Sequence, residues 1–202
     1  MKNFPSYTPG QILTKFDLKG EELIIKVPEE RDIVDIRELL SKIARDFYIA
    51  DRYDYPSIDS MRDRYNRVIK LAKKGKDVYF IGQIKGKTIL TTNYSIKKIM
   101  TGKYKGKISM EIGISIDKDY QKKGIGGKIL DFFIEMARGV GIKIIIGRFF
   151  HENFDSLVLC KSRGLNVYKI EKNKPPCNKK WKKDFHKWGR CYDRVNSRLF
   201  IE

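Results

Sequence analysis

A glycine-rich loop between a strand pattern and a helix pattern constrains this sequence more than any other feature. Residues 108–116 alternate between apolar side chains and small or polar ones, which predicts a strand with one buried face. The loop that follows contains Gly124, Gly126 and Gly127, and the apolar residues after it predict a helix over 126–138. A strand, a glycine loop and a helix in this order gather backbone groups at the start of the helix.

The chemistry of this loop suits a pyrophosphate. Glycines allow backbone angles that a Cβ atom would hinder, so successive N–H groups can converge on one point. The helix adds its positive dipole end and the unpaired donors of its first turn. Lys122, Lys123 and Lys128 supply positive charge around that point. The alternative is that the glycines form a turn that merely ends the strand.

Two common phosphate-binding loops are excluded. A Walker loop has Ser or Thr after its Gly-Lys pair, whereas Gly127-Lys128 is followed by Ile129. The dinucleotide-binding fingerprint has a third glycine three residues after Gly126, and Ile129 occupies that position as well. The loop therefore belongs to neither class.

The remaining patterns predict one α/β (α+β) domain over residues 21–202, with the order β-α-α-β-β-β-α-β-α-β-β. Residues 1–20 carry turn signals and are expected to form an N-terminal extension. A basic insertion over 172–190 is expected to precede the last strand. The expected strands lie at 22–27, 78–84, 88–94, 108–116, 142–149, 165–170 and 194–201. The expected helices lie at 33–47, 57–75, 126–138 and 153–163.

The chain of 202 residues has a formal net charge of +18, which attracts anions. Residues 172–190 hold eight cationic residues against the single acid Asp184, and Trp181, Phe185 and Trp188 recur there at helical spacing. The aromatic face of this helix either docks on the body of the protein or stacks on bases while the lysines meet phosphates. The second reading predicts a polyanionic acceptor or partner, RNA or an acidic protein. The alternative is that most of the charge only solvates a lysine-rich surface.

Cysteine usage and hydropathy favour a cytoplasmic protein. Three cysteines at irregular spacing argue against a disulfide framework. We expect no membrane partner, because no apolar run approaches the roughly 20 residues that span a bilayer and no secretory signal is recognisable. Cys177, His186 and Cys191 match no common zinc spacing, so we expect no metal site.

Two segments resemble the acetyl-CoA signature of the GNAT superfamily of acetyl-CoA-dependent N-acetyltransferases. The first is Gln121-x-x-Gly124-x-Gly126, which follows the isoleucine-rich strand. The second is Asn153-x-x-Ser156-x-x-Leu159-Cys160-x-x-x-Gly164-Leu165. The resemblance implies the GNAT fold, a central, mixed, mostly antiparallel sheet that is splayed and carries helices on both faces.

The resemblance also implies how acetyl-CoA binds as the acyl donor. Backbone amides of the loop would hold the pyrophosphate, and backbone groups of Ile114 and Ile116 would pair with the pantetheine arm. Asn153 and Ser156 would contact the same arm from the other side. The implied cofactor-binding residues are Ile114, Ile116, Gln121, Lys122, Lys123, Gly124, Ile125, Gly126, Gly127, Asn153 and Ser156.

Acyl transfer to an amine needs a base and benefits from an acid. Glu111, in the polar row of the strand 108–116, is the candidate base, because some family members carry a catalytic glutamate near there. Its alternative role is a carboxylate that pairs with a lysine. Many family members have a tyrosine acid where this chain has Cys160, which we interpret as an inert packing residue. Tyr168 is a substitute acid, and a thiolate that leaves unaided is the other possibility.

We therefore expect an N-acetyltransferase that moves an acetyl group from acetyl-CoA to a primary amine. The acceptor candidates are a protein amine, an aminoacyl-tRNA, a polyamine and a small metabolite. The rival hypothesis is a non-catalytic module that binds acyl-CoA or nucleic acid on the same fold, and the cysteine at the tyrosine position keeps it open. The sequence leaves the oligomeric state, monomer or homodimer, undecided.

Overall fold

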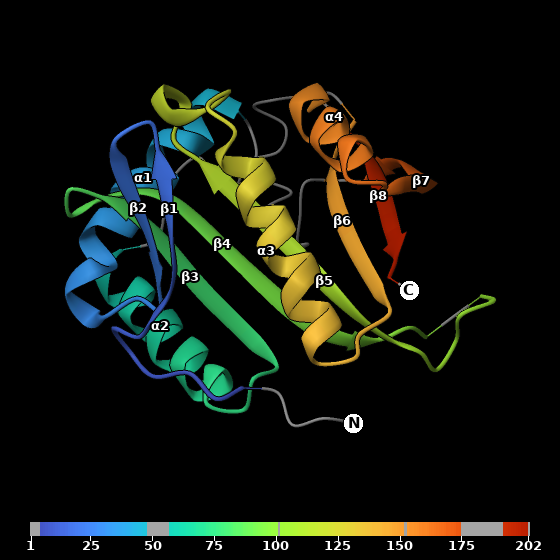
Figure 1. Cartoon of the computed structure of the whole chain (residues 1–202), viewed down its shortest axis with the longest axis horizontal. Coiled ribbons are helices and arrows are strands. Elements are labelled where there is room, and N and C mark those ends of the chain that lie inside the picture. The colour runs from blue at the N-terminus through green and yellow to red at the C-terminus, as the bar shows by residue number, and fades with distance from the viewer. Residues whose placement is uncertain (1–4, 48–56, 101, 152, 175–191, 202) are drawn as a thin grey trace.

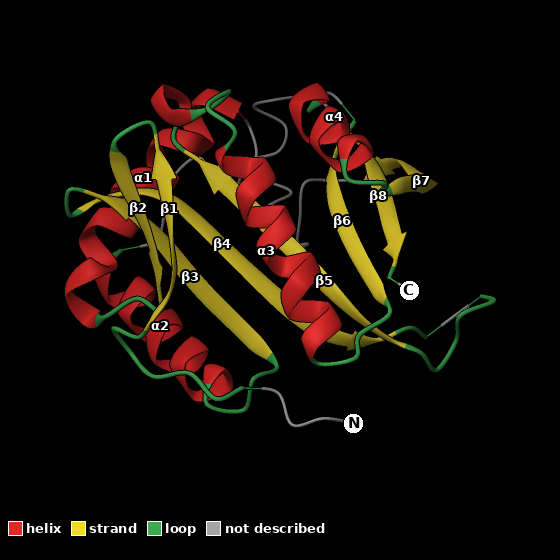
Figure 2. Ribbon diagram, viewed as in Figure 1, coloured by secondary structure: helices red, strands yellow, loops and turns green. Residues whose placement is uncertain are grey.

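An eight-stranded sheet carries helices on both faces (Figures 1 and 2). The computed structural model describes residues 5–47, 57–100, 102–151, 153–174 and 192–201. The strands are β1 Ile12–Leu18, β2 Glu21–Lys26, β3 Asp77–Ile84, β4 Lys87–Lys98, β5 Ile108–Ile116, β6 Ile144–Phe150, β7 Asn166–Lys174 and β8 Tyr192–Phe200. The helices are η1 Glu30–Asp32, α1 Ile33–Phe47, α2 Ile58–Ala72, η2 Lys118–Tyr120, α3 Ile125–Gly139 and α4 Phe154–Ser162.

The strand order is β1-β2-β3-β4-β5-β6-β8-β7, and the sheet is mixed but mostly antiparallel. The pair of β5 and β6 is parallel, and the other neighbouring pairs of the described strands are antiparallel. The fold class that the sequence predicts is therefore confirmed.

Adjacent residues of β3 show how the two faces are covered. Phe80 is fully buried against Phe133 of α3, with ring centres 6.2 Å apart. Ile81 points to the opposite face and joins a buried cluster with Ile36 of α1 and Met61 of α2. Helix α3 thus covers one face of the sheet, and α1 and α2 cover the other (Figure 1).

Helix α3 is fixed by its apolar face, which sets the position of the loop before it. Ile125, Ile129, Phe133 and Ala137 recur at every fourth position and are buried in the main core. Truncating a buried aromatic such as Phe133 to Ala costs about 3–5 kcal/mol, so this face holds the helix firmly against the sheet.

The sheet splits between β5 and β6. Along β5, β4 pairs with every residue from Ile108 to Ile116. On its other side, β5 pairs with β6 only from Met110 to Ile112, opposite Ile145 to Gly147. Figure 1 shows the two strands diverging beyond this short ladder. The backbone of β5 after Ile112 therefore faces an opening in the described sheet, as the resemblance implied.

The predicted element order lacks one strand. Residues 12–18, inside the segment expected as an extension, form the edge strand β1 and pair antiparallel with β2. Lys19 and Gly20 form the two-residue turn between them, with φ of 57° and 93°. Two positive φ values in a two-residue loop are typical of a tight hairpin. The Lys19-Gly20 pair next to an apolar strand is the signal that could have revealed this hairpin.

The expectations of no membrane span and of a basic insertion can be compared with the described residues only. In the residues that the structure describes, no helix is both long and apolar enough to cross a membrane. Most of the expected basic insertion, residues 175–190, lies outside the described residues, together with its aromatic positions. Its first residues, 172–174, belong to the end of β7.

Candidate active site

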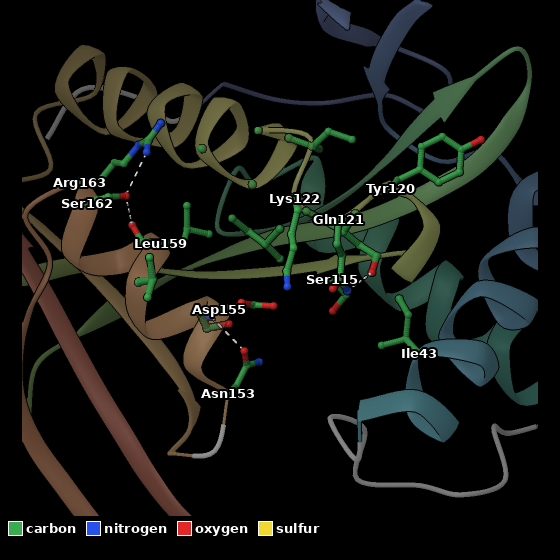
Figure 3. A pocket seen from close by; sticks show the side chains of 18 residues that line it. Ile43, Ser115, Tyr120, Gln121, Lys122, Asn153, Asp155, Leu159, Ser162 and Arg163 are labelled. Atoms are coloured by element: carbon green, nitrogen blue, oxygen red, sulfur yellow. Dashed lines mark hydrogen bonds between the residues drawn. The ribbon is translucent and has the colours of Figure 1, made fainter.

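A cavity of about 360 Å³ opens where the end of β5, the start of α3 and helix α4 meet (Figure 3). Ile43 of α1 lines the wall of the cavity opposite α4. The residues predicted to bind the cofactor gather here from three separate parts of the sequence, and Lys123 is the exception. The predicted residues that line the cavity are Ile114, Ile116, Gln121, Lys122, Gly124, Ile125, Gly126, Gly127, Asn153 and Ser156.

Helix α3 begins at this cavity without a side-chain cap. Its N-cap residue is Gly124, which has a φ of 78°, and the first turn contains no acidic residue. The N–H of Lys128 donates to the carbonyl of Gly124 at 3.2 Å. The amides of the preceding turn have no partner within the helix, so they are donors available to an anion.

The backbone before α3 curls around the same point. Lys122 has a φ of 58°, and Gly124 is also left-handed. Alternation of this kind turns successive N–H groups inward and forms a concave anion site. A left-handed lysine is uncommon, and the sequence pattern had indicated this conformation only for glycines. Figure 3 shows the Lys122 side chain pointing into the cavity from the wall opposite Asp155 of α4.

The glycines of the loop serve two different purposes. Gly124 has the positive φ that the sequence predicts, whereas Gly126 and Gly127 lie in the helix without one. A Cβ atom on Gly126 would lie 3.1 Å from Leu159 of α4, and one on Gly127 would collide with the guanidinium of Arg163. At these two positions the missing Cβ leaves room for Leu159 and Arg163, which corrects our expectation that backbone freedom is the reason.

Gln121 fastens the loop to the strand. Its backbone N–H donates to the carbonyl of Lys118 at 3.2 Å, and its side-chain Nε2 donates to the carbonyl of Ile116 at 3.0 Å. The amide of Gln121 is thus already used, in contrast to our expectation that it faces the pyrophosphate. The donors that remain for a ligand begin at Lys122.

Lys42 of α1 ties the other end of the loop. Its Nζ atom lies 2.7 Å from Asp117, which is buried, and 2.8 Å from Asp119. The hydrogen bonds to these two carboxylates raise the pKa of Lys42, and the bond from Lys42 lowers the pKa of Asp119. Lys42 was not among the residues predicted from the sequence, because its partners lie 75 and 77 positions further along the chain.

Asn153 caps α4 at the opposite wall. Its Oδ1 atom accepts a hydrogen bond from the N–H of Ser156 at 3.0 Å. Both residues line the cavity, and Figure 3 shows the Asn153 side chain at its edge. The side-chain oxygen of Asn153 is therefore used by the cap, and its side-chain NH2 group is the part that can donate to a ligand.

Glu111 lies on β5 but does not line the cavity in the described structure. Its carboxylate bridges two strands, with Lys97 of β4 at 2.8 Å and Arg148 of β6 at 3.2 Å. The alternative role from the sequence, pairing with a lysine, is thus present in the structure. Catalysis by Glu111 remains a prediction.

Three further residues lie apart from the cavity. Tyr168 is on the edge strand β7, 39% exposed, with its ring centre 4.4 Å from the Arg198 guanidinium carbon. Lys123 is exposed, and its Nζ atom lies 4.8 Å from the centre of the Tyr120 ring. Cys160 is buried in the core, and burial raises the pKa of its thiol. The packing role that we predict for Cys160 agrees with this environment.

No group of three or more His, Cys, Asp or Glu side chains in the described residues is arranged to hold a metal ion. Cys177, His186 and Cys191 lie outside those residues, so the expected absence of a metal remains a prediction.

Several solved structures share this fold. RimL, a ribosomal L7/L12 α-N-protein acetyltransferase in complex with coenzyme A, superposes with a TM-score of 0.72 at 15% identity, over 93% of this chain and 98% of its own. A ribosomal-protein-S5-alanine acetyltransferase from Vibrio fischeri gives 0.70 at 17% identity, over 93% and 97%. The yncA protein from Salmonella typhimurium, solved with its cofactor acetyl-CoA, gives 0.66 at 16% identity, over 89% and 94%.

At these low identities the similar structures show the fold alone. No curated protein matches the chain significantly in sequence. The family comparison is independent of them. Residues 33–164, which run from the first residue of α1 past the end of α4, match the acetyltransferase (GNAT) family. The chain belongs to the GNAT family of acetyltransferases.

Proposed function

We propose that this protein is an N-acetyltransferase that uses acetyl-CoA to acetylate a primary amine. The observation that carries the proposal is the uncapped start of α3, which opens into the cavity beside the splay between β5 and β6. An anionic group can satisfy the first turn of α3, and an extended chain with amides can pair with the free side of β5. Acetyl-CoA contains both, as a diphosphate and a pantetheine arm.

The proposed binding mode assigns each part of the cofactor to described groups. The backbone from Lys122 to Gly126 holds the diphosphate, with the positive end of the α3 dipole behind it. The free side of β5 at Ile114 and Ile116 pairs with the pantetheine arm, and Asn153 donates from the opposite wall. When bound, acetyl-CoA supplies the thioester whose acetyl group is transferred. The protein fixes its direction along β5, so that acetyl group and amine share one cleft.

We propose Glu111 as the group that takes the proton from the amine. An unperturbed alkylammonium group has a pKa of about 10.4, so a positioned carboxylate or a water held by it assists at neutral pH. Glu111 lies on the same strand as Ile114, and its carboxylate is held between Lys97 and Arg148. Tyr168 lies on the edge strand β7, two strands from β6, which makes the departing thiolate without a protein acid the simpler proposal.

A protein α-amine is the acceptor that we favour. The support is that two proteins of similar fold are named for acetylating ribosomal proteins. Aminoacyl-tRNA, polyamines and small metabolites remain alternatives. The net charge of +18 supports a polyanionic acceptor or partner, either RNA or an acidic protein. RNA binding that weakens steeply with salt would support this part, and binding that is absent at low salt would contradict it.

The remaining assignments are also proposals. A cytoplasmic location rests on the irregular spacing of the three cysteines. A non-catalytic acyl-CoA-binding module is the second candidate function, and the observation that favours it is the double ion pair of Glu111 together with the buried thiol at Cys160.

The decisive experiment measures thiol release from acetyl-CoA with a panel of amines, including peptides with free α-amines. Release that depends on one acceptor class supports the enzyme. Cofactor binding by calorimetry without release for any acceptor supports the second candidate. Gly124→Val should abolish cofactor binding, whereas Gly20→Val is the matched control, since both glycines have positive φ and open space around Cα. Equal loss in both variants would contradict the assignment.

Glu111→Gln tests the proposed base. Turnover should fall about a hundredfold, most severely at low pH, while the affinity for acetyl-CoA stays the same. Glu135→Gln is the control, because Glu135 is also an ion-paired carboxylate but lies on α3. Wild-type rates at every pH in the Glu111 variant would rule out this residue as the base.

A further inference from the structure

Arg163, directly after α4, places its guanidinium against the first turn of α3 (Figure 3). Its Nε and Nη2 atoms donate to the two carboxylate oxygens of Asp131 at 3.1 and 3.2 Å. Its Nη1 atom donates to Ser162 at 3.0 Å, and the Ser162 hydroxyl in turn donates to the carbonyl of Leu159 at 2.8 Å. The guanidinium is therefore held in one orientation by contacts on both helices.

These contacts leave some N–H donors of the guanidinium free. A guanidinium has five N–H donors, and the three contacts above use three of them. The side chain is 33% exposed and lines the same cavity as the loop. Lys122 and Arg163 are the two cationic side chains among the described lining residues, and they reach the cavity from different walls.

Arg163 lies against Gly127 and donates hydrogen bonds to Asp131 of α3, just beyond the loop that is proposed to hold the diphosphate. Asn153 precedes the helix and Arg163 follows it, so the two ends of α4 are about 14 Å apart. In the proposed binding mode the pantetheine arm lies at Asn153 and the diphosphate at the start of α3. Continuing in the same direction along coenzyme A, the next charged group after the diphosphate is the phosphate on the ribose.

We propose that Arg163 binds the ribose 3′-phosphate of coenzyme A and that the protein thereby distinguishes the cofactor from its dephosphorylated form. This inference rests on the proposed function. Gly127 makes room for the guanidinium, and Asp131 orients it. A planar guanidinium with two unused N–H donors is well suited to a phosphate dianion. Asp131 is thus a positioning residue, whose own charge opposes the phosphate.

The test compares the affinities of coenzyme A and 3′-dephospho-coenzyme A by calorimetry. The wild-type protein should bind coenzyme A about tenfold more tightly. Arg163→Gln should lose this preference by weakening only the binding of coenzyme A. The matched control is Arg138→Gln, which removes an ion-paired arginine at the other end of α3 and should leave both affinities unchanged.

Asp131→Asn separates recognition from a purely structural clip between α3 and α4. It should keep or strengthen the preference for coenzyme A, because Asn retains one acceptor oxygen that orients Arg163 and removes the negative charge beside the phosphate. The proposal is overturned if the wild type binds both ligands equally, if Arg163→Gln weakens both to the same extent, or if Asp131→Asn loses the preference as Arg163→Gln does. A wild type that binds neither ligand would instead overturn the proposed function.

Discussion

Helices α3 and α4 both begin at the cavity, but only α4 carries a side-chain cap. The Asn153 side chain accepts the N–H of Ser156, and Asp155 adds a negative charge to the first turn. Helix α3 begins at Gly124 with neither a cap nor an acid. The positive end of α4 is thus neutralised within the protein, whereas that of α3 is left for a ligand. The contrast supports the proposed anion site more strongly than the number of glycines does.

Adding a side-chain cap to α3 would make its start resemble that of α4, and we expect this change to lower the affinity for coenzyme A the most. Gly124→Asp supplies a carboxylate to the free N–H groups, and Asp tolerates a left-handed backbone better than most residues. The affinity for coenzyme A should fall about a hundredfold or more, because the new charge lies at the position proposed for the diphosphate. Gly124→Asn has the same shape without the charge and should lose less. Calorimetry and thermal melting distinguish lost binding from lost folding; unchanged affinity in the Asp variant would contradict the site.

Removing the ion pairs that hold the loop before α3 should lower the affinity for coenzyme A by an intermediate amount. Lys42→Met removes the tie to Asp117 and Asp119, so the backbone donors become less well ordered. We expect the affinity for coenzyme A to fall about tenfold through poorer positioning. Lys128→Met is the comparison, because it removes an exposed cation from the first turn of α3 and leaves the tie intact. An equal loss in both variants would indicate that only charge matters.

The same tie has a definite pH dependence. The lowered pKa of Asp119 means that its contribution to stability is present above the ordinary carboxyl pKa of about 3.9 and is lost as pH falls through the lowered value. The raised pKa of Lys42 means that its contribution is present below about 10.4 and is lost as pH rises through the raised value. The difference in unfolding free energy between wild type and Lys42→Met should stay constant between these limits and shrink in acid. A difference that grows in acid would contradict the ion pair.

Changing the cap of α4 should have smaller effects than changing the start of α3. Asn153→Ala removes the acceptor for Ser156 and should lower the free energy of unfolding by about 1 kcal/mol, together with the cofactor affinity. Asn153→Asp keeps the acceptor but loses the amide donor, so stability should hold while affinity falls a few-fold. If the Asp variant binds the cofactor as the wild type does, the amide of Asn153 makes no contact with it.

Cys160→Ala should have the smallest effect. The thiol is buried, and burial raises its pKa, so it stays protonated at neutral pH as a packing group. Turnover should remain within about twofold of wild type. A large loss of turnover without a loss of stability would make Cys160 a proton donor after all.

The sequence alone predicted the features that depend on local patterns. The positive φ of Gly124 and the apolar face of α3 follow from neighbouring residues, and both are present. Strand β5 is also present, but its burial does not alternate as predicted: Ser109 is buried and donates to the carbonyl of Lys97, whereas Ile114 and Ile116 are partly exposed and line the cavity. The contacts of Lys42 and Arg163 could not be predicted in this way, because their partners are distant in sequence and meet only after the helices pack. Gly127 illustrates both cases, since its place in the glycine-rich loop is visible in the sequence but its purpose depends on Arg163, which directly follows α4.

The three-residue ladder between β5 and β6 has a consequence for unfolding cooperativity. It divides the described sheet into a larger part, β1 to β5, and a smaller part, β6, β8 and β7, and the ion pair of Glu111 with Arg148 crosses the seam. A ligand that pairs with β5 and contacts α4 spans this seam and binds only when both parts are folded together. We therefore expect coenzyme A to couple the two parts, so that amides along the seam exchange hydrogen more slowly by an amount set by ligand concentration and affinity.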